Sequence, residues 1–292
     1  MPHIVCFGEV LFDVFPNHTK IGGAPLNVAL RLASLGIKTD IISKIGQDDL
    51  GLEIMSFMNE NNVSSQYLQV DKTLETGQVL VNLDQNGSAT YQIKYPVSWD
   101  KIEVTEAAKA VVSHCDAFVF GSLIGRDLTS YQTLLSLISF AKYKIFDVNL
   151  RAPFYEKNKL VELMQLADFL KFNDDELFEI CEMLGSPYHS LEQNILFVAK
   201  HSNTAQICVT KGSHGAVLYQ NNQFFYNSGF KVKVQDTVGS GDSFLAALLS
   251  QLLVTFDPQV AINFACAIGA MVAQHEGANP KISAEEIERF MN

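Results

Sequence analysis

The sequence predicts an α/β protein with a mostly parallel central sheet and a small β-sheet lid. Short β-branched or aromatic runs alternate with amphipathic stretches along most of the 292 residues. Such repetition places helices on both faces of a parallel sheet. With 48% apolar and 18% charged residues, the chain can bury a large core and is neither a linker nor a disordered tail. Its length fits about two domains, or one large α/β domain with an insertion.

Each element of this alternation can be placed on the chain. The predicted strands of the central sheet are short apolar runs: Ile4–Gly8, Asp40–Ile45, Ala117–Gly121, Lys144–Val148, Asp168–Phe172 and Gln206–Thr210. The predicted helices between them are amphipathic: Leu26–Leu35, Leu50–Asn62, Ser130–Ala141, Asp174–Leu184 and Gln193–His201. The last third holds a hairpin and then two long helices: Ala216–Tyr219, Gln223–Tyr226, Asp242–Leu253 and Pro258–Gln274. Because parallel sheets bind ligands at the carboxyl ends of their strands, the motifs at those ends are the functional candidates.

One segment departs from this alternation. Gly77–Ile93 alternates polar and apolar residues around Asn86-Gly87, which is a strong hairpin turn pair. No helix accompanies it, so together with Phe12–Ile21 it is predicted to form a small sheet that projects over the site as a lid. The alternative is an edge hairpin on the main sheet.

Charge and cysteine usage exclude several classes of protein. The 21 basic and 32 acidic residues give a net charge of −11, which argues against nucleic acid or an anionic membrane as partner. No apolar run approaches the length of a membrane span, and the start MPHIVCFGEV indicates a strand rather than a signal peptide. Five scattered cysteines fit reduced thiols in a cytoplasmic protein, and the absence of CxxC, HxxxH and HExxH argues against zinc.

The sharpest motif runs from Asp236 to Asp242 (DTVGSGD), where small residues end a loop as a helix begins. The first turn of such a helix presents unpaired N–H groups and a positive dipole end, which bind phosphate and stabilise a phosphoryl group in transfer. Asp242 is a candidate base for an attacking hydroxyl. Aspartate also caps helices, so the motif alone leaves cap and catalyst open.

A second glycine motif, GGAPLN, runs from Gly22 to Asn27 and opens a helix with Pro25 in its first turn. Gly22 and Gly23 allow the backbone to approach a small ligand, and Asn27 offers a donor and an acceptor for a hydroxyl. Asp13 points from a strand end toward the same space. The structural alternatives are a tight turn, a polar first-turn residue and a solvated aspartate.

Asn173-Asp174-Asp175-Glu176 opens another predicted helix. Asn173 and Glu176 have the spacing of a capping box. Alternatively, the acidic cluster organises Mg²⁺ near nucleotide phosphates, because Mg²⁺ takes one or two carboxylates together with water and phosphate.

Other strand ends suit a nucleotide. Arg151 follows a predicted strand and is a candidate clamp for a phosphate or a sugar oxygen, or else a surface ion-pair partner. Thr210–Gly215 is a glycine-rich turn suited to backbone approach by a nucleotide, or else a turn between strands that needs no ligand. The small residues Ala261, Ala265, Ala267, Gly269, Ala270 and Ala273 leave a slot for a flat base or simply allow close helix packing. No GxxxxGK[ST], GxGxxG after the first strand, or GxSxG occurs, which argues against P-loop, dinucleotide-binding and α/β-hydrolase chemistry.

Taken together, these motifs resemble the PfkB (ribokinase-like) family of sugar kinases. GGAPLNVA at Gly22–Ala29, with Gly36 and Gly46 at the family spacing, matches its first signature, and DTVGSGDSFLAALL at Asp236–Leu249 matches its second. The resemblance implies a ribokinase-like Rossmann-type sandwich, with ATP as phosphoryl donor and Mg²⁺ as cofactor. It divides the chain into a catalytic core (1–11, 23–72 and 98–292) and a β-lid over the sugar site (12–22 and 73–97).

The resemblance also implies roles for individual residues. Asp242 is expected to be the base, with Gly239, Ser240 and Gly241 as the anion hole and Arg151 as a further catalytic group. The expected sugar-binding residues, besides Asp242, are Asp13, Gly22, Gly23 and Asn27. The expected nucleotide-binding residues are Asn173, Lys211, Gly212, Gly215, Gly239, Gly241, Cys266 and Gly277. Asn173 and Glu176 match the pair that holds Mg²⁺ through phosphate and water.

The acceptor sugar is predicted from smaller features. GGAPLN and DVNLR look more like the fructokinase branch than like ribokinases, and Tyr91 and Val79 are expected to cover a sugar face. Kinases of 2-keto-3-deoxygluconate share much of this pattern, and ribose or a nucleoside are further alternatives. Only Lys94 and Arg126 are seen as basic candidates near the lid, which favours a neutral sugar over a carboxylated one.

The remaining expectations concern ions and partners. Asp236 and Gly277 match ligands of a monovalent cation, but Lys281 follows GANP where the family often has Ser, so weak K⁺ activation is predicted. Lid sheets in this family often pair, so a homodimer through the lid is possible. A sugar-binding regulator that has lost catalysis, and a nicotinamide dehydrogenase on a similar sheet, are the rivals from other classes. The intact Asp242 argues against the regulator, and the missing dinucleotide motif argues against the dehydrogenase.

Overall fold

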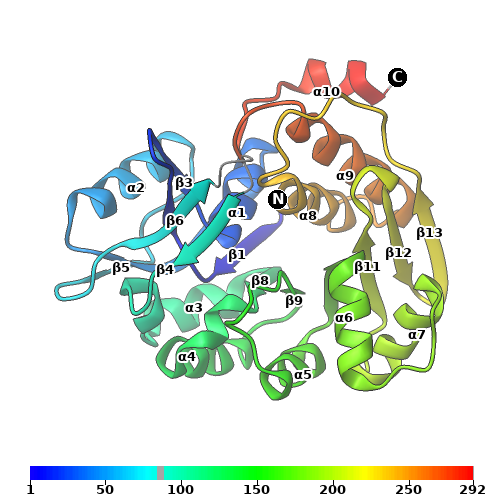
Figure 1. Cartoon of the computed structure of the whole chain (residues 1–292), viewed down its shortest axis with the longest axis horizontal. Helices are drawn as coiled ribbons and strands as arrows, with labels where there is room; N and C mark the ends of the chain where they lie inside the picture. The colour runs from blue at the N-terminus through cyan, green and yellow to red at the C-terminus, as the bar shows by residue number, and fades with distance from the viewer. Residues whose placement is uncertain (84–88, 292) are drawn as a thin grey trace.

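A computed structural model describes residues 1–83 and 89–291, and the strands within these ranges form two separate sheets (Figure 1). The larger has nine strands in the spatial order β13 (Gln223–Asn227), β12 (Ala216–Gln220), β11 (Gln206–Thr210), β10 (Phe169–Asn173), β9 (Lys144–Asp147), β8 (Ala117–Gly121), β1 (His3–Phe7), β4 (Lys38–Gly46) and β5 (Leu68–Asp71). All its pairs are parallel except β11–β12 and β12–β13.

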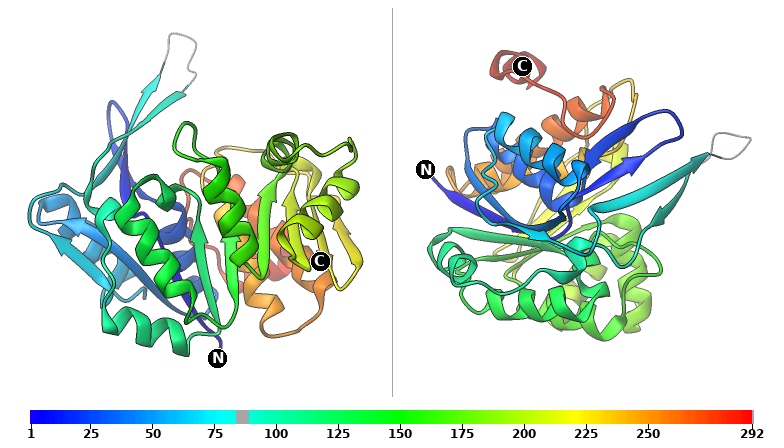
Figure 2. Two further views of the ribbon diagram at one scale, coloured as in Figure 1. Left: turned by 90° about the horizontal axis from the view of Figure 1, so that it is seen from below. Right: turned by 90° about the vertical axis from the view of Figure 1, so that its left-hand side faces the viewer.

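Helices cover both faces of this sheet (Figure 2). The helices packed on one face are α1 (Ala24–Ser34), α2 (Asp49–Glu60), α8 (Ser240–Leu252) and α9 (Pro258–Ala273). Those on the other face are α3 (Glu106–His114), α4 (Leu128–Ile138), α5 (Lys157–Leu166), α6 (Asp174–Leu184) and α7 (Leu191–Ser202). α10 (Ala284–Met291) packs against α9, and three 3₁₀ turns are described: η1 (Ser98–Lys101), η2 (Leu123–Arg126) and η3 (Gly212–His214).

Burial on both faces explains why the central strands are continuous apolar runs. In β1, Ile4 and Cys6 join the hydrophobic cluster of one face, whereas Val5 and Phe7 join the cluster of the other. Side chains alternate across a strand, so a doubly covered strand needs apolar residues at every position. The predicted α/β class is therefore confirmed.

The smaller sheet has the order β3 (Thr19–Gly22), β2 (Leu11–Val14), β6 (Gly77–Leu83) and β7 (Ala89–Ile93). β2 pairs antiparallel with β3 and parallel with β6. Both views of Figure 2 show it projecting from the central body. The predicted lid sheet is confirmed, and the edge-hairpin alternative is wrong because these strands do not join the central sheet. The predicted turn pair Asn86-Gly87 lies outside the described residues, as do the side chains of 82–91, including that of Tyr91.

The prediction overlooked α3, α5, α10 and the edge strand β5. The α3 sequence EAAKAVVSH is short and has few large apolar residues, and α5 (KNKLVELMQL) begins with three polar residues. Neither segment carries a long apolar stripe, which is the signal used to predict helices. Among the described residues, no helix has both the length and the hydropathy needed to cross a membrane.

Candidate active site

Two cavities meet at the N-terminus of α8. The lid cavity, about 600 Å³, lies between the lid sheet and the carboxyl ends of the central strands. The α9 cavity, about 580 Å³, lies between α8, α9 and the η3 turn. Four residues line both cavities: Asn173, Thr210, Thr237 and Gly241. A group bound at Gly241 is therefore accessible from both sides.

The start of α8 is shaped by a glycine in the left-handed region. Gly239 has φ of 72°, and a Cβ there would collide with that of Ala278. The Ser240 N–H donates to the Thr237 carbonyl at 3.2 Å, and the Ser243 N–H donates to the Gly239 carbonyl at 2.8 Å. Within the described part of the chain, the N–H groups of Gly241 and Asp242 have no such partner. These two unpaired donors are therefore available to an anion where the cavities meet.

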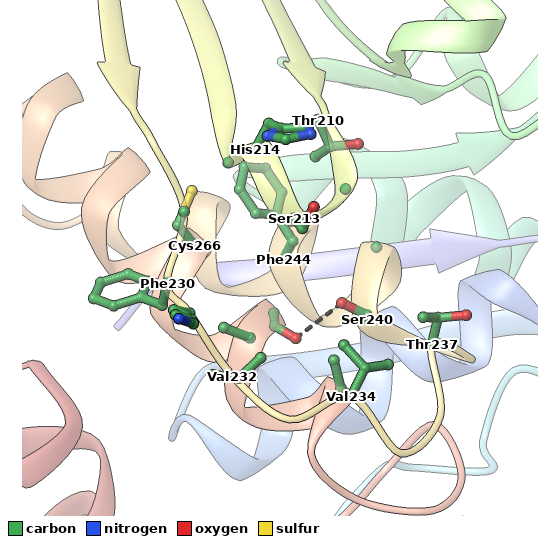
Figure 3. Close-up of a pocket in the computed structure, with 18 of the residues that line it drawn as sticks. Thr210, Ser213, His214, Phe230, Val232, Val234, Thr237, Ser240, Phe244 and Cys266 are labelled. Atoms are coloured by element: carbon green, nitrogen blue, oxygen red, sulfur yellow. Dashed lines mark hydrogen bonds between the residues drawn. The ribbon is translucent and has the colours of Figure 1, made fainter.

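Ser240 is used differently from the prediction. Its hydroxyl donates to the Gly269 carbonyl at 2.9 Å, shown as the dashed line in Figure 3. Because its N–H is also paired, Ser240 fastens α8 to α9 rather than presenting a free donor.

Asp242 lies in the wall of the lid cavity, in the first turn of α8. Its Oδ2 accepts a hydrogen bond of 2.8 Å from Nδ2 of Asn27. Burial, and then the nearby charge of Asp147, raise its pKa to about 6, although the Asn27 hydrogen bond, Lys171 and Arg151 lower it. A carboxylate that titrates just below neutral pH is suited to accept a proton.

Two more carboxyl groups line the lid cavity. Glu9 follows β1, is 4% exposed, and has an Oε2 without a partner among the described residues. Its burial raises its pKa to about 7. Asp13, on β2, has a pKa raised to about 6 by burial, against the opposing charges of Arg151 and Lys20. The cavity thus holds three carboxyls that bind protons near neutral pH.

A buried ion pair lies beneath these groups and was not predicted. Lys171 Nζ donates to Asp147 Oδ1 at 3.0 Å. Burial disfavours the ammonium, but Asp147, Glu176 and Asp242 together hold the pKa of Lys171 above its usual range. A Cβ on Gly241 would lie 3.5 Å from Nζ, so this fixed positive charge borders the junction of the cavities. A lysine inside the apolar strand FLKFN was the available signal.

Asn173 and Glu176 form the predicted capping box. Asn173 Oδ1 accepts from the Glu176 N–H at 2.7 Å, and Glu176 Oε2 accepts from the Asn173 N–H at 2.8 Å. Glu176 Oε1 also accepts from the Leu150 N–H at 2.9 Å, and the side chain lines the lid cavity. Each carboxylate oxygen retains a lone pair, so the capping role does not prevent a bond to hydrated Mg²⁺.

The basic groups of the lid cavity differ from those predicted. Lys94 pairs with Glu75 at 3.2 Å, and Arg126 is buried against Asp100, with Nε and a terminal nitrogen at 2.7 and 2.8 Å from its two oxygens. Neither residue lines the cavity. The basic residues that do line it are Lys20, Arg151 and Lys171, so the predicted pair was wrong.

The α9 cavity has a different chemistry. Figure 3 shows side chains from η3, α8, α9 and the connector before α8 converging around it, among them Phe230, Val232 and Cys266. The small residues Gly269, Ala270 and Ala273 form its α9 wall. Gly212 and Gly215 line it, whereas Lys211 and Gly277 do not. The predicted slot beside small residues of this helix is thus an open cavity.

Asp236 lies where a monovalent cation was predicted. Its Oδ1 accepts from the Val238 N–H at 3.0 Å, and its Oδ2 accepts from the Gly277 N–H at 2.9 Å. Lys20 Nζ, which is bonded to Glu276 at 2.8 Å, lies 4.0 Å from the same Oδ2. The ammonium beside Asp236 therefore belongs to Lys20, while Lys281 is exposed.

The chain is similar to known proteins along nearly its whole length. The model of the pfkB family of carbohydrate kinases matches residues 1–285. Fructokinase-2 of Solanum lycopersicum is 26% identical over 311 residues, covering 96% of this chain and 92% of that protein. The structure of an uncharacterized sugar kinase from Pyrococcus horikoshii has a TM-score of 0.84 at 26% identity, covering 98% and 97% of the two chains. A Vibrio cholerae fructokinase double mutant with fructose, ADP and potassium ion bound has a TM-score of 0.86 at 24% identity, covering 100% and 99%.

Proposed function

The chain belongs to the pfkB family of carbohydrate kinases, which are ATP-dependent phosphotransferases with the predicted ribokinase-like fold, and we propose that its acceptor is fructose. The observation that carries the kinase chemistry is the position of Asp242, which lies beside the unpaired N–H groups where the lid cavity meets the α9 cavity. Fructose as acceptor is supported by the fructokinases among the relatives.

In the proposed reaction the sugar occupies the lid cavity. An Asp242 oxygen takes the proton of a sugar hydroxyl as the hydroxyl oxygen bonds to the γ-phosphorus of ATP. The bond from this phosphorus to the β–γ bridging oxygen breaks, and ADP leaves. The proton remains on Asp242 until it is released to water. This reaction needs a carboxylate that is ionised near neutral pH, and a pKa of about 6 for Asp242 meets that need.

The phosphoryl group in transfer carries developing negative charge. We assign its stabilisation to the N–H groups of Gly241 and Asp242, within the loop of Gly239 and Ser240, and to the buried ammonium of Lys171. Arg151, which lines the same cavity, is assigned to a phosphate or sugar oxygen. These groups are held by the folded scaffold, so little rearrangement opposes the reaction.

The sugar is held by the walls of the lid cavity. Asp13 is assigned to a hydroxyl, and the backbone of Gly22 and Gly23 to close contact with the ring. The Asn27 amide already donates to Asp242 and accepts from Asn279, so one N–H of its Nδ2 remains for a sugar hydroxyl.

The nucleotide is assigned to the α9 cavity. Its apolar and small-residue walls, with Cys266, fit a flat base, and Gly212 and Gly215 allow backbone approach. Lys211 and Gly277 do not line the cavity, but Lys211 lies between two lining residues, Thr210 and Gly212, and we assign both to its edge. The nucleotide phosphates then extend toward Gly239 and Gly241.

Asn173 and Glu176 fit Mg²⁺ at the junction. Their oxygens are hard donors, and Asp147 Oδ2 is buried nearby without a partner among the described residues. No group of three or more His, Cys, Asp or Glu in residues 1–83 and 89–291 forms a metal cage. This arrangement suits an ion held through phosphate and water. When bound, Mg²⁺ neutralises charge on the phosphate oxygens.

One observation favours a second class of acceptor. The exposed guanidinium of Arg151 lines the lid cavity and bonds only to the neighbouring Leu150 carbonyl among the described residues. With Lys20 it could bind a carboxylate, as on 2-keto-3-deoxygluconate.

We also propose that the protein acts in the cytoplasm and forms a homodimer through its lid sheet.

A coupled ADP-release assay with MgATP separates these acceptors. The panel is fructose, ribose, glucose, 2-keto-3-deoxygluconate and adenosine. We expect fructose to have the highest kcat/KM. A faster rate with 2-keto-3-deoxygluconate that is lost in Arg151→Ala would show that the acceptor is a sugar acid. The proposed reaction with Asp242 as base would still stand. No turnover, with sugar binding still seen by calorimetry, would indicate a regulator and contradict the proposed function.

A further inference from the structure

Helix α1 makes two contacts, one turn apart, with the segments on either side of the reaction site. Asn27 and Arg31 are four residues apart and therefore lie on the same face of the helix. Asn27 contacts Asp242 of α8 and Asn279 of the loop after α9. Arg31 contacts the residues that follow these two in sequence, Ser243 and Pro280. We name this set of six residues the α1 clamp.

The hydrogen bonds of the Asn27 contact run in one direction. Ionised Asp242 can only accept, so the Asn27 amide must turn its Nδ2 toward Oδ2, at 2.8 Å. The Asn27 carbonyl then points to the other side, where Nδ2 of Asn279 donates to it at 2.8 Å. Asn279 Oδ1 is buried and has no partner among the described residues. The bond from Asn279 therefore supports the Asn27 orientation that donates to the base.

The Arg31 contact sets the spacing of the same two segments. Its side chain is 2% exposed, with Nε donating to Ser243 Oγ at 3.1 Å and a terminal nitrogen donating to the Pro280 carbonyl at 3.0 Å. The guanidinium is planar and rigid, so it fixes the distance between its two acceptors. Ala278, which precedes Asn279, already packs against Gly239. The loop thus contacts the segment that leads into α8 directly, and α1 links it to α8 at two further positions.

We propose that Asn279 and Arg31 are positioning residues that hold the carboxylate of Asp242 in its reactive orientation through α1. This inference rests on the proposed role of Asp242 as the base. A free aspartate side chain can rotate about two bonds, whereas catalysis requires its oxygen to stay within hydrogen-bond reach of one hydroxyl. Neither Asn279 nor Arg31 lines either cavity, so both act on turnover rather than on substrate binding.

Asn279→Ala and Asn279→Asp test the amide contact. Alanine removes the donor to Asn27, and we expect kcat to fall about fivefold to tenfold. Aspartate places a carboxylate against the Asn27 carbonyl, which turns the amide so that its oxygen faces Asp242. We expect that variant to lose about 50-fold or more in kcat. For Asn279→Ala, the KM for sugar and for ATP should stay within about twofold, because the Asn27 amide keeps its place in the cavity wall. For Asn279→Asp, only the ATP KM should stay within about twofold, because the turned Asn27 amide also withdraws its N–H from the sugar.

Asn61→Ala is the matched control. It also removes one part-buried amide donor, at 2.8 Å from the Phe57 carbonyl, but lies at the end of α2 outside both cavities. Its kcat should equal that of the wild type. Arg31→Lys keeps the charge but cannot bridge Ser243 and Pro280, and we expect about a tenfold loss of kcat. Combined with Asn279→Ala, it should cost less than the product of the single effects, because both act on one carboxylate.

Three results would overturn the clamp. One is an unchanged kcat in Asn279→Ala, another is a loss of activity that only follows a lowered Tm, and the third is an aspartate variant no worse than alanine. If Asp242→Ala itself stays active, the proposed function fails and the clamp with it. If Asp242→Ala is inactive while the Asn279 variants are normal, only the clamp fails.

Discussion

The two cavities that meet at Gly241 are similar in volume and opposite in chemistry. The lid cavity is lined by Glu9, Asp13 and Asp242, whose pKa values all lie near neutral pH, and by the basic residues Lys20, Arg151 and Lys171. The α9 cavity is lined mainly by apolar side chains and small residues of one helix. The difference separates two tasks. In the proposed function, proton transfer and charge stabilisation take place in the lid cavity, whereas the α9 cavity binds the nucleotide base through its shape.

If the α9 cavity acts only through its shape, filling it should affect nucleotide binding alone. Ala270→Phe places a ring in the slot, and we expect KM for ATP to rise tenfold or more, about the effect of overpacking an apolar site. The sugar KM should not change. Lys200→Phe, on the exposed side of α7, is the control. Steady-state kinetics with each substrate varied separately would reveal an effect on the sugar, which would mean that the cavities are not separate.

If the lid cavity does the proton chemistry, pH should act through it. Asp242 must be ionised to accept a proton, so kcat/KM should be level above its pKa of about 6 and fall about tenfold for each pH unit below it. Stability should change in the opposite direction. Glu9, Asp13 and Asp242 have raised pKa values in the folded protein, so protonation between pH 7 and pH 5 favours folding. As the pH is lowered from 7 to 5, Tm should rise while activity falls. A decrease in both Tm and activity would contradict the assignment.

Removing a sugar contact should have a smaller effect than changing the charge of the base. For Asn27→Ala we expect the sugar KM to rise about fivefold, from loss of its remaining N–H donor, with a further decrease in kcat from loss of the bond to Asp242. Initial rates at varied sugar concentration measure both. An unchanged sugar KM would leave Asn27 as a positioning residue only.

The smallest effect is expected for monovalent cations. Asp236 already accepts two N–H bonds and has the Lys20 ammonium 4.0 Å away, so K⁺ should have little to add. We expect replacement of Na⁺ by K⁺ to change the rate less than about twofold. A large increase would show that the ion displaces Lys20.

The sequence predicted the parts of this molecule that depend on neighbours along the chain. Central strands buried on both faces are runs of apolar residues, and the loop before α8 is a run of small residues that precedes a helix. Both patterns lie within a few neighbouring residues, so both elements could be located. The lid sheet was also predicted, because a period-two run without a helix does not fit a parallel sheet.

Contacts between distant residues could not be predicted in the same way. The roles of Arg31 and Asn279 depend on partners that lie more than 200 positions away along the chain. Lys171 is one charged residue in an apolar strand, and its contact with Asp147 depends on β9 and β10 being neighbours. The basic groups of the lid cavity were misidentified for the same reason, since proximity to the lid in sequence does not place a side chain inside the cavity.

The most direct test of the account compares wild-type protein with Asp242→Ala, using MgATP and fructose. ADP release measures turnover, and calorimetry measures fructose binding. We predict that the substitution lowers kcat by about 10³-fold while fructose binding stays within a few-fold of wild type, because the base acts in the transition state. Turnover within about tenfold of wild type would show that Asp242 is not the base and would contradict the account.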